Sequence, residues 1–332
     1  MRMPARDRSR LIFAAAMLVA GTIAVADRAI AQDAFPVKPL RMLVPFPPGG
    51  VTDIIARLIA PKMSEGLKQN VLVENRPGAN GNIAVDIVAK SQPDGYTLLF
   101  GQVSNLAVNP AVYRNIPFDP VRDLAPVALV ASAPQIIVVS AGSGFKSVAD
   151  VLAAAKAKPG EVTFASSGLG SMAHMGIELM QLSAGIKFLH IPYKGASPAI
   201  IDVIGGRAAV FMAAVPSVMG QMRGGKLRGI AVTSAKRVKD LPDIPTLAES
   251  GFPGYEGGNW FAVMGRAGTA PAIIARLNAE VNKSLDAPDV KARIASEGGT
   301  ILGGTAAQLA AQLQADLVKW KRVVKEAGIK LD

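Results

Sequence analysis

Residues 40–53 read LRMLVPFPPGGVTD: an apolar strand candidate, a loop rich in proline and glycine, and the start of a helix. Leu40–Phe46 has the length and composition of a buried strand, and Asp53–Lys68 repeats apolar residues every three or four positions. A strand that passes through a tight loop into an amphipathic helix is the first half of a βαβ unit. This stretch therefore indicates an α/β fold with a mostly parallel sheet.

The alternation of strands and helices continues on the C-terminal side of this stretch. Val71–Glu74 and Tyr96–Gly101 are strand candidates, and Ile83–Lys90 between them is helical. A second series follows after the apolar run Val127–Ala131. Its predicted strands are Gln135–Ser140, Val162–Ala165, Phe188–Ile191, Ala208–Ala213 and Leu227–Val232, and its predicted helices include Ser147–Lys158 and Ser171–Ala184.

The C-terminal part of the chain is predicted to be helical, and this determines how we divide the chain into lobes. After the strand candidate Asn259–Gly265 only helices are predicted, and these need an existing sheet to cover. A mature chain of about 300 residues also exceeds what one compact core usually holds. We therefore expect two α/β lobes with a ligand cleft between them, lobe 1 from residues 32–132 plus 260–332 and lobe 2 from residues 133–259.

The first thirty residues have the pattern of an export signal. Four arginines between Arg2 and Arg10 precede the uncharged apolar run Leu11–Ala26, and Ala29-Ile30-Ala31 offers small residues to a signal peptidase. The alternative is a membrane anchor, but a spanning helix needs about 20 apolar residues and this run is shorter. We predict a signal peptide over residues 1–31, cleaved after Ala31.

Composition excludes several classes of protein. The chain has no cysteine, so it has no disulfide, no thiolate metal site and no N-terminal cysteine for a lipid anchor. An exported chain without such an anchor is expected in the periplasm. Without residues 1–31 its formal charge is +8, yet no dense basic run interleaved with aromatic residues is present. We therefore expect no nucleic-acid partner.

Two loops between a strand and a helix are candidate anion sites. The first, Pro45–Asp53, has paired glycines and free amides at a helix start, although a simple βα turn capped by Thr52 or Asp53 explains it equally well. The second, Phe164–His174, has three serines and three glycines or alanines before its helix. It lacks both the Gly-Lys-Ser/Thr of a phosphate-binding P-loop and the first glycine of a nucleophile elbow.

Other candidates are isolated residues. Tyr193 ends a strand and can wall a ligand, or it can be an ordinary packed turn residue. Trp260, at the second crossing between lobes, is a candidate for the cleft wall or for the core between the lobes. His174 and His190 are the only imidazoles. We expect His190 to be a core residue and His174 to orient the ligand or its neighbours, with no catalytic residue and no metal site.

Taken together, the chain resembles the Bug family, the substrate-binding receptors of tripartite tricarboxylate transporters, from Phe35 to its C-terminus. The resemblance implies a type II periplasmic-binding-protein fold, closure on a ligand, no cofactor, and delivery to a membrane permease. The matching segments include Pro45–Asp53, Val73–Gly78, Pro93–Leu98, Ser166–Ser171, Pro192–Gly195, Ala231–Ser234, Leu241–Thr246 and Leu277-Asn278.

The resemblance also assigns ligand-binding residues. It implies that backbone amides, hydroxyls and ordered water hold a carboxylate in the two loops, through Phe46, Gly49, Thr52, Ser166, Ser167, Gly170 and Ser171. Two segments depart from the family pattern. Gln102–Leu106, with Ser104, replaces a common Thr-x-Gly-Thr-His, and Ala213-Ala214 stands where a polar pair is usual. The far end of the ligand is therefore expected to differ.

The expected function is a monomeric receptor that captures a small organic carboxylate for uptake by a tripartite tricarboxylate-type permease. Two alternatives remain from the sequence. One is a receptor that reports its ligand to a sensor kinase, whose lobes would be of the same kind. The other is a periplasmic hydrolase that uses Ser167 or Ser171 with His174.

Overall fold

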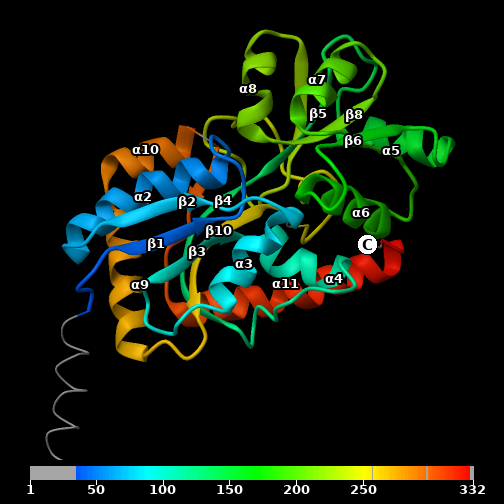
Figure 1. Ribbon diagram of the computed structural model, residues 1–332. Helices are drawn as coiled ribbons and strands as arrows, with labels where there is room; N and C mark the ends of the chain where they lie inside the picture. Colours follow the sequence, from blue (N-terminus) through cyan, green and yellow to red (C-terminus); the bar gives the residue numbers. More distant parts are fainter. Residues whose placement is uncertain (1–34, 256, 297, 330–332) are drawn as a thin grey trace, which may run out of the picture.

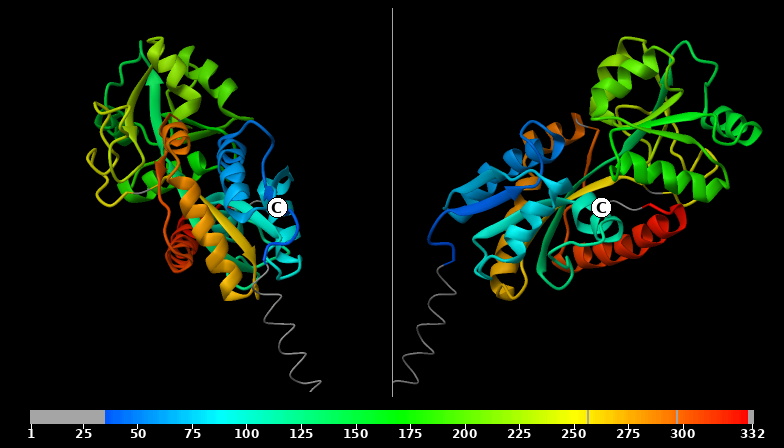
Figure 2. Two further views of the ribbon diagram at one scale, coloured as in Figure 1. Left: turned by 90° about the vertical axis from the view of Figure 1, so that its left-hand side faces the viewer. Right: turned by 45° about the vertical axis from the view of Figure 1, so that its right-hand side comes forward.

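The computed structural model describes residues 35–255, 257–296 and 298–329. The predicted signal peptide and its cleavage site lie outside these ranges. The described chain forms two lobes, each built on one β-sheet with helices packed against it (Figures 1 and 2). Within these ranges no helix is both long enough and apolar enough to cross a bilayer.

Lobe 1 contains a six-stranded mixed sheet in the order β11-β4-β10-β3-β1-β2. The pairings of β1 with β2 and with β3 are parallel, as the βαβ pattern predicts, but β10 pairs antiparallel with both β3 and β4. The expectation of a mostly parallel sheet is therefore wrong for this half, because β10 and β11 come from the distant C-terminal part of the chain. The strands are β1 (Leu40–Val44), β2 (Val71–Asn75), β3 (Thr97–Gln102), β4 (Leu124–Ala133), β10 (Asn259–Arg266) and β11 (Thr300–Ile301).

The helices of lobe 1 bury apolar stripes against this sheet. On α2, residues Ile55, Ile59 and Met63 are fully or almost fully buried and pack on β1 and β3. The stripe follows the helical repeat that the sequence shows. The elements are α2 (Val51–Leu67), a 3₁₀ turn (Ala79–Gly81), α3 (Asn82–Ala89), a π-helical turn (Ser104–Val108), α4 (Asn109–Val112), α9 (Pro271–Leu285), α10 (Pro288–Ser296) and α11 (Ala306–Ala327).

Lobe 2 contains a five-stranded mixed sheet in the order β7-β6-β8-β5-β9. Its strands β6, β7 and β8 run parallel, and β5 pairs antiparallel with β8 and β9. The elements are β5 (Gln135–Ser140), α5 (Val148–Ala157), β6 (Thr163–Ser166), α6 (Met172–Ala184), β7 (Leu189–Pro192), α7 (Ala196–Ile204), β8 (Val210–Ala214), α8 (Val215–Arg223) and β9 (Leu227–Val232).

Two segments join the sheets. β4 ends at Ala133 and β5 begins at Gln135, so only Pro134 separates a strand of lobe 1 from a strand of lobe 2. The return passes through residues 233–258 into β10. The C-terminal helix α11 lies along lobe 1 and also packs on α6 of lobe 2, as Figure 1 shows at the lower right. The lobes are thus connected by neighbouring strands and by this helix.

Helix α5 illustrates how local sequence fixes an element. Ser147 Oγ accepts a hydrogen bond from Asp150 N (3.2 Å), and the Asp150 carboxylate accepts one from Ser147 N (2.9 Å), which is a complete capping box.

We expect Ser147→Ala to lower the free energy of unfolding by about 1 kcal/mol, because a first-turn amide loses its acceptor. Urea unfolding measures this change. Ser296→Ala, an exposed serine at a helix end, is the control and is expected to change stability far less. Equal effects in the two variants would contradict the capping role.

Candidate functional site

A cavity of about 260 Å³ lies between the two lobes, where strands of both sheets end. Lobe 1 contributes a mainly polar wall and lobe 2 a wall of serines and small or apolar side chains. The lining residues of lobe 1 are Phe46, Asn80, Gln102, Ser104 and Asn259, and those of lobe 2 are Gln135, Ser167, Ser171, Met172, Ala173, Ala196, Phe211, Ala213, Ala214 and Ser217. No charged side chain is among these described lining residues.

The polar wall of lobe 1 is organised around the Gln102 amide. Gln102 Oε1 accepts hydrogen bonds from Thr52 Oγ1 (3.1 Å) and Asn259 Nδ2 (2.9 Å), and Gln102 Nε2 donates to Ser104 Oγ (2.8 Å). These contacts determine the orientation of the Gln102 amide, because its oxygen faces two donors and its nitrogen faces the Ser104 hydroxyl. Thr52, predicted as a ligand residue, is buried and does not line the cavity; it supports Gln102 instead.

The first loop is held by the buried Asp53 carboxylate. It accepts hydrogen bonds from Gly49 N (2.9 Å), Asn75 Nδ2 (2.8 Å) and Arg57 Nε (2.9 Å). Burial alone raises the pKa of Asp53, but these donors bring it below its ordinary value. Of the residues predicted in this loop, Phe46 therefore lines the cavity, whereas the Gly49 amide donates to the Asp53 carboxylate.

The second loop places two of its serines on the cavity and the other groups behind it. Ser167 and Ser171 line the cavity, and Ser171 Oγ also caps α6 by accepting from His174 N (3.2 Å). Ser166 is fully buried, with its Oγ 2.7 Å from His190 Nε2. The Gly170 amide donates to His174 Nδ1 (3.1 Å).

The uncapped starts of two helices border the cavity on the side of lobe 2. The N-cap residues of α7 and α8, Gly195 and Ala214, provide no side-chain cap, and Ala196 and Ala214 line the cavity. Uncapped first-turn amides and the helix dipole both favour an anion. The cavity is thus suited to a negatively charged group without any basic side chain.

Two predicted residues lie away from this cavity. The Tyr193 hydroxyl donates to Asp202 Oδ2 (2.7 Å); burial, together with this hydrogen bond and the charge of Asp202, raises the pKa of Tyr193 to about 12. Trp260 is buried, and its Nε1 donates to Asp316 Oδ2 (2.6 Å). In this structure both side chains hold elements together and neither lines the cavity.

Several of the lining residues were not predicted from the sequence. Asn80, Gln135, Phe211, Ser217 and Asn259 all lie on the cavity. Asn80 follows β2 and Gln135 follows the lobe crossing at Pro134, and ligands of open α/β sheets bind beyond the carboxyl ends of strands. That rule is the signal that points to Asn80.

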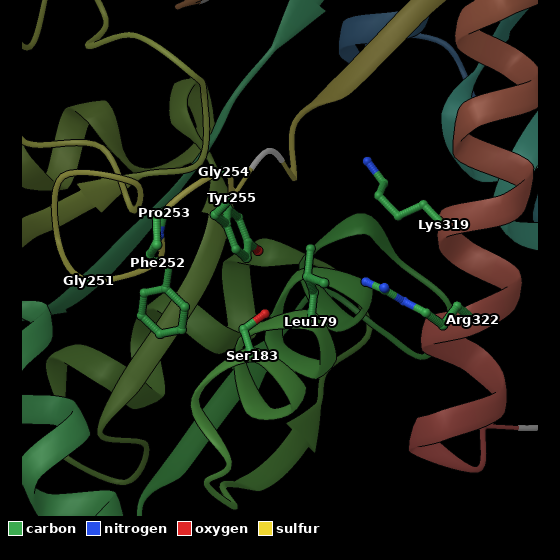
Figure 3. Close-up of a pocket in the computed structure, with 9 residues that line it drawn as sticks. All are labelled: Leu179, Ser183, Gly251, Phe252, Pro253, Gly254, Tyr255, Lys319 and Arg322. Carbon is green, nitrogen blue, oxygen red and sulfur yellow. The ribbon is translucent and has the colours of Figure 1, made fainter.

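A second cavity, of about 330 Å³, lies where α11 approaches α6 and the loop 251–255 (Figure 3). It is larger, but none of the predicted ligand residues lines it, and two of its polar groups already have partners. Lys319 pairs with Asp316 (2.7 Å), and the Tyr255 hydroxyl donates to the Gly176 carbonyl (3.0 Å). The smaller cavity at the loop serines is therefore the candidate ligand site.

Comparison with protein families identifies the chain. A family model described as "Tripartite tricarboxylate transporter family receptor" (TctC) matches residues 55–329. The chain belongs to this family. The resemblance found in the sequence is thereby confirmed. TctC proteins are receptors, so this chain is a solute-binding protein and not an enzyme, and the hydrolase alternative is wrong.

Relatives of this TctC protein agree with that assignment. Protein BugT of Bordetella pertussis is 41% identical over 303 residues, 91% of this chain and 93% of its own. A solved structure described as a periplasmic transporter is 35% identical with a TM-score of 0.78, covering 90% of this chain and 100% of its own. The structure "R. palustris Rpa4515 with adipate" is 36% identical with a TM-score of 0.78, covering 89% and 99%. These matches confirm the two-lobed binding-protein fold.

Proposed function

We propose that this protein binds a small organic carboxylate in the cavity between its lobes and delivers it to a membrane permease of the tripartite tricarboxylate type. The observation that carries the proposal is an interlobe cavity bordered by uncapped helix starts and serine hydroxyls, with no charged lining side chain among the described residues. Such a cavity stabilises an anion through amides and hydroxyls. Two relatives, 36% and 29% identical, have structures with adipate and with malate.

The proposed ligand contacts follow from the cavity. Phe46, Ser104, Ser167 and Ser171 line it and are assigned to the carboxylate or the chain that bears it. Thr52, Ser166, Gly170 and His174 lie behind these groups and are assigned to positioning them. Gly49, Tyr193 and Trp260 are assigned to the support of the surrounding loops and strands.

We also propose that the mature protein is a periplasmic monomer, produced by cleavage after Ala31. Several structural relatives are described as periplasmic. The N-terminal pattern of an arginine-rich segment, an apolar run and small residues supports export. The mass of the mature protein recovered from the periplasm tests the cleavage site.

A thermal-shift screen tests the ligand class. A panel of carboxylates that includes adipate and malate is compared with neutral solutes. At a concentration 100 times its Kd a ligand adds about 2.7 kcal/mol to stability, which is a shift of several degrees. We expect at least one carboxylate to raise the melting temperature by this amount. We expect Ser167→Trp, whose side chain fills the cavity, to remove the shift. Stabilisation by neutral solutes alone would refute the proposal.

A further inference from the structure

The only two histidines of the chain lie against each other directly behind the second loop. His174 comes from α6 and His190 from β7, and their rings stack with centroids 4.2 Å apart and planes at 6°. His174 is almost fully buried, and His190 is partly buried. The proposed function uses neither ring as a ligand contact.

Each ring holds one end of the loop Ser166–Ser171. His174 Nδ1 accepts a hydrogen bond from Gly170 N (3.1 Å), and His190 Nε2 lies 2.7 Å from Ser166 Oγ. A ring nitrogen that accepts carries no proton, so His174 is neutral with its proton on Nε2. That Nε2 faces Glu178 Oε1 at 3.5 Å, one turn further along the same helix.

This arrangement argues against a metal site. The possible ligand atoms of His174, Glu178 and His190 lie within 4.8 Å of one another. A metal-bound histidine, however, keeps its second ring nitrogen as a donor, whereas His174 Nδ1 is an acceptor here. Two parallel stacked rings also direct their lone pairs side by side rather than toward one point. The cluster therefore holds the loop by hydrogen bonds.

We propose that the His174–His190 pair positions the loop Ser166–Ser171 for ligand binding while both rings are neutral, and that protonation of His174 releases the loop. A proton on His174 Nδ1 would face the Gly170 amide, so two donors would oppose each other. The loop would then lose the contact that orients the residues between Gly168 and Ser171. This inference rests on the proposed function, because it takes Ser167 and Ser171 as ligand contacts.

The surrounding charges agree with a neutral pair. Burial, reinforced by repulsion from His174 once that ring is charged, lowers the pKa of His190 to about 4, and Glu178 acts in the opposite direction. Glu178 itself shares a surface cavity with Lys187 and Glu326. On the side of α6 that faces α11, Lys319 and Arg322 approach at Leu179 and Ser183. His190 therefore stays neutral when His174 is protonated.

Nuclear magnetic resonance of the purified protein labelled with ¹³C and ¹⁵N in histidine and with ¹⁵N in glycine tests the pair directly, because only two ring systems contribute. At pH 7.5 we expect His174 as the Nε2–H tautomer, and on acidification we expect the Gly170 amide signal to move with the His174 ring signals. A proton on His174 Nδ1 at pH 7.5, or a Gly170 amide that ignores the titration, would overturn the proposal. This arm needs no ligand.

The second arm measures affinity for the best carboxylate of the panel. Between pH 7.5 and pH 5.0 we expect a loss of about tenfold in the wild type, with its midpoint at the His174 titration. His174→Asn keeps an acceptor near Gly170 but cannot be protonated, so its loss should be under about threefold. Equal losses in both proteins would refute the positioning role. If no carboxylate binds, the proposed function fails, and the ring titration still decides the inference.

Discussion

Ala214→Asp is expected to weaken carboxylate binding about a hundredfold while leaving the fold intact. Ala214 lines the cavity and is the N-cap residue of α8, where it provides no side-chain acceptor. An aspartate caps a helix well, so the free protein should be as stable as the wild type or more stable. The same carboxylate, within about 5 Å of a bound anion, costs about 3 kcal/mol at an effective dielectric constant of 20. This corresponds to a loss of about a hundredfold in affinity.

Ala214→Asn is the matched control for this experiment. Asparagine caps a helix about as well as aspartate and has nearly the same size, but it has no charge. Calorimetric titration of both variants with the panel's best carboxylate separates charge from bulk. If Ala214→Asp binds within about threefold of Ala214→Asn, the ligand carries no negative charge near α8.

Asp316→Ala is expected to lower the free energy of unfolding by about 2–4 kcal/mol, because it leaves buried donors without their acceptor. The buried Asp316 carboxylate accepts from Trp260 Nε1 (2.6 Å) and Gln312 Nε2 (2.8 Å) and pairs with Lys319 (2.7 Å). It thereby ties α11 to β10. Urea unfolding gives the change in stability.

Asp286→Ala is the control for the buried carboxylate. Its side chain is 82% exposed and pairs only with Lys291 in the described chain, so its loss should change stability by less than about 0.5 kcal/mol. A change below about 1 kcal/mol in Asp316→Ala would show that the Trp260 hydrogen bond contributes little. Trp260 would then be open again to a role in ligand binding.

Much of the fold followed from local pattern. The predicted strand Leu227–Val232 matches β9, and the predicted helix Ser171–Ala184 matches α6, since both have clear periodicity and clear ends. Shorter elements were missed. β11 has two residues, and the helical turns between Ser104 and Val112 are too short for a periodic signal. The antiparallel pairing of β10 in lobe 1 joins segments more than a hundred residues apart, which no local pattern encodes.

The candidate site was likewise predicted only in part. Both strand–loop–helix turns were visible in the sequence, because serine, glycine and proline mark them. The partners of those residues were not. Gln102 receives hydrogen bonds from Thr52 and from Asn259, which is 157 residues away, and the tertiary fold alone brings the three together. The contact of Gly170 with His174 could not be predicted either, because the orientation of the His174 ring depends on its stacking against His190 of β7.

The position of β10 sets an order for how the chain acquires its structure. β10 lies between β3 and β4 in the sheet of lobe 1, yet it follows all of lobe 2 in the sequence. Until residues 259–266 are in place, β3 and β4 have no common neighbour and the first sheet has a gap at its centre. Lobe 2 is continuous in sequence, and contacts between sequence neighbours form faster than distant ones. Lobe 2 can therefore fold as a unit by itself, whereas lobe 1 remains incomplete until the part of the chain beyond lobe 2 has joined it.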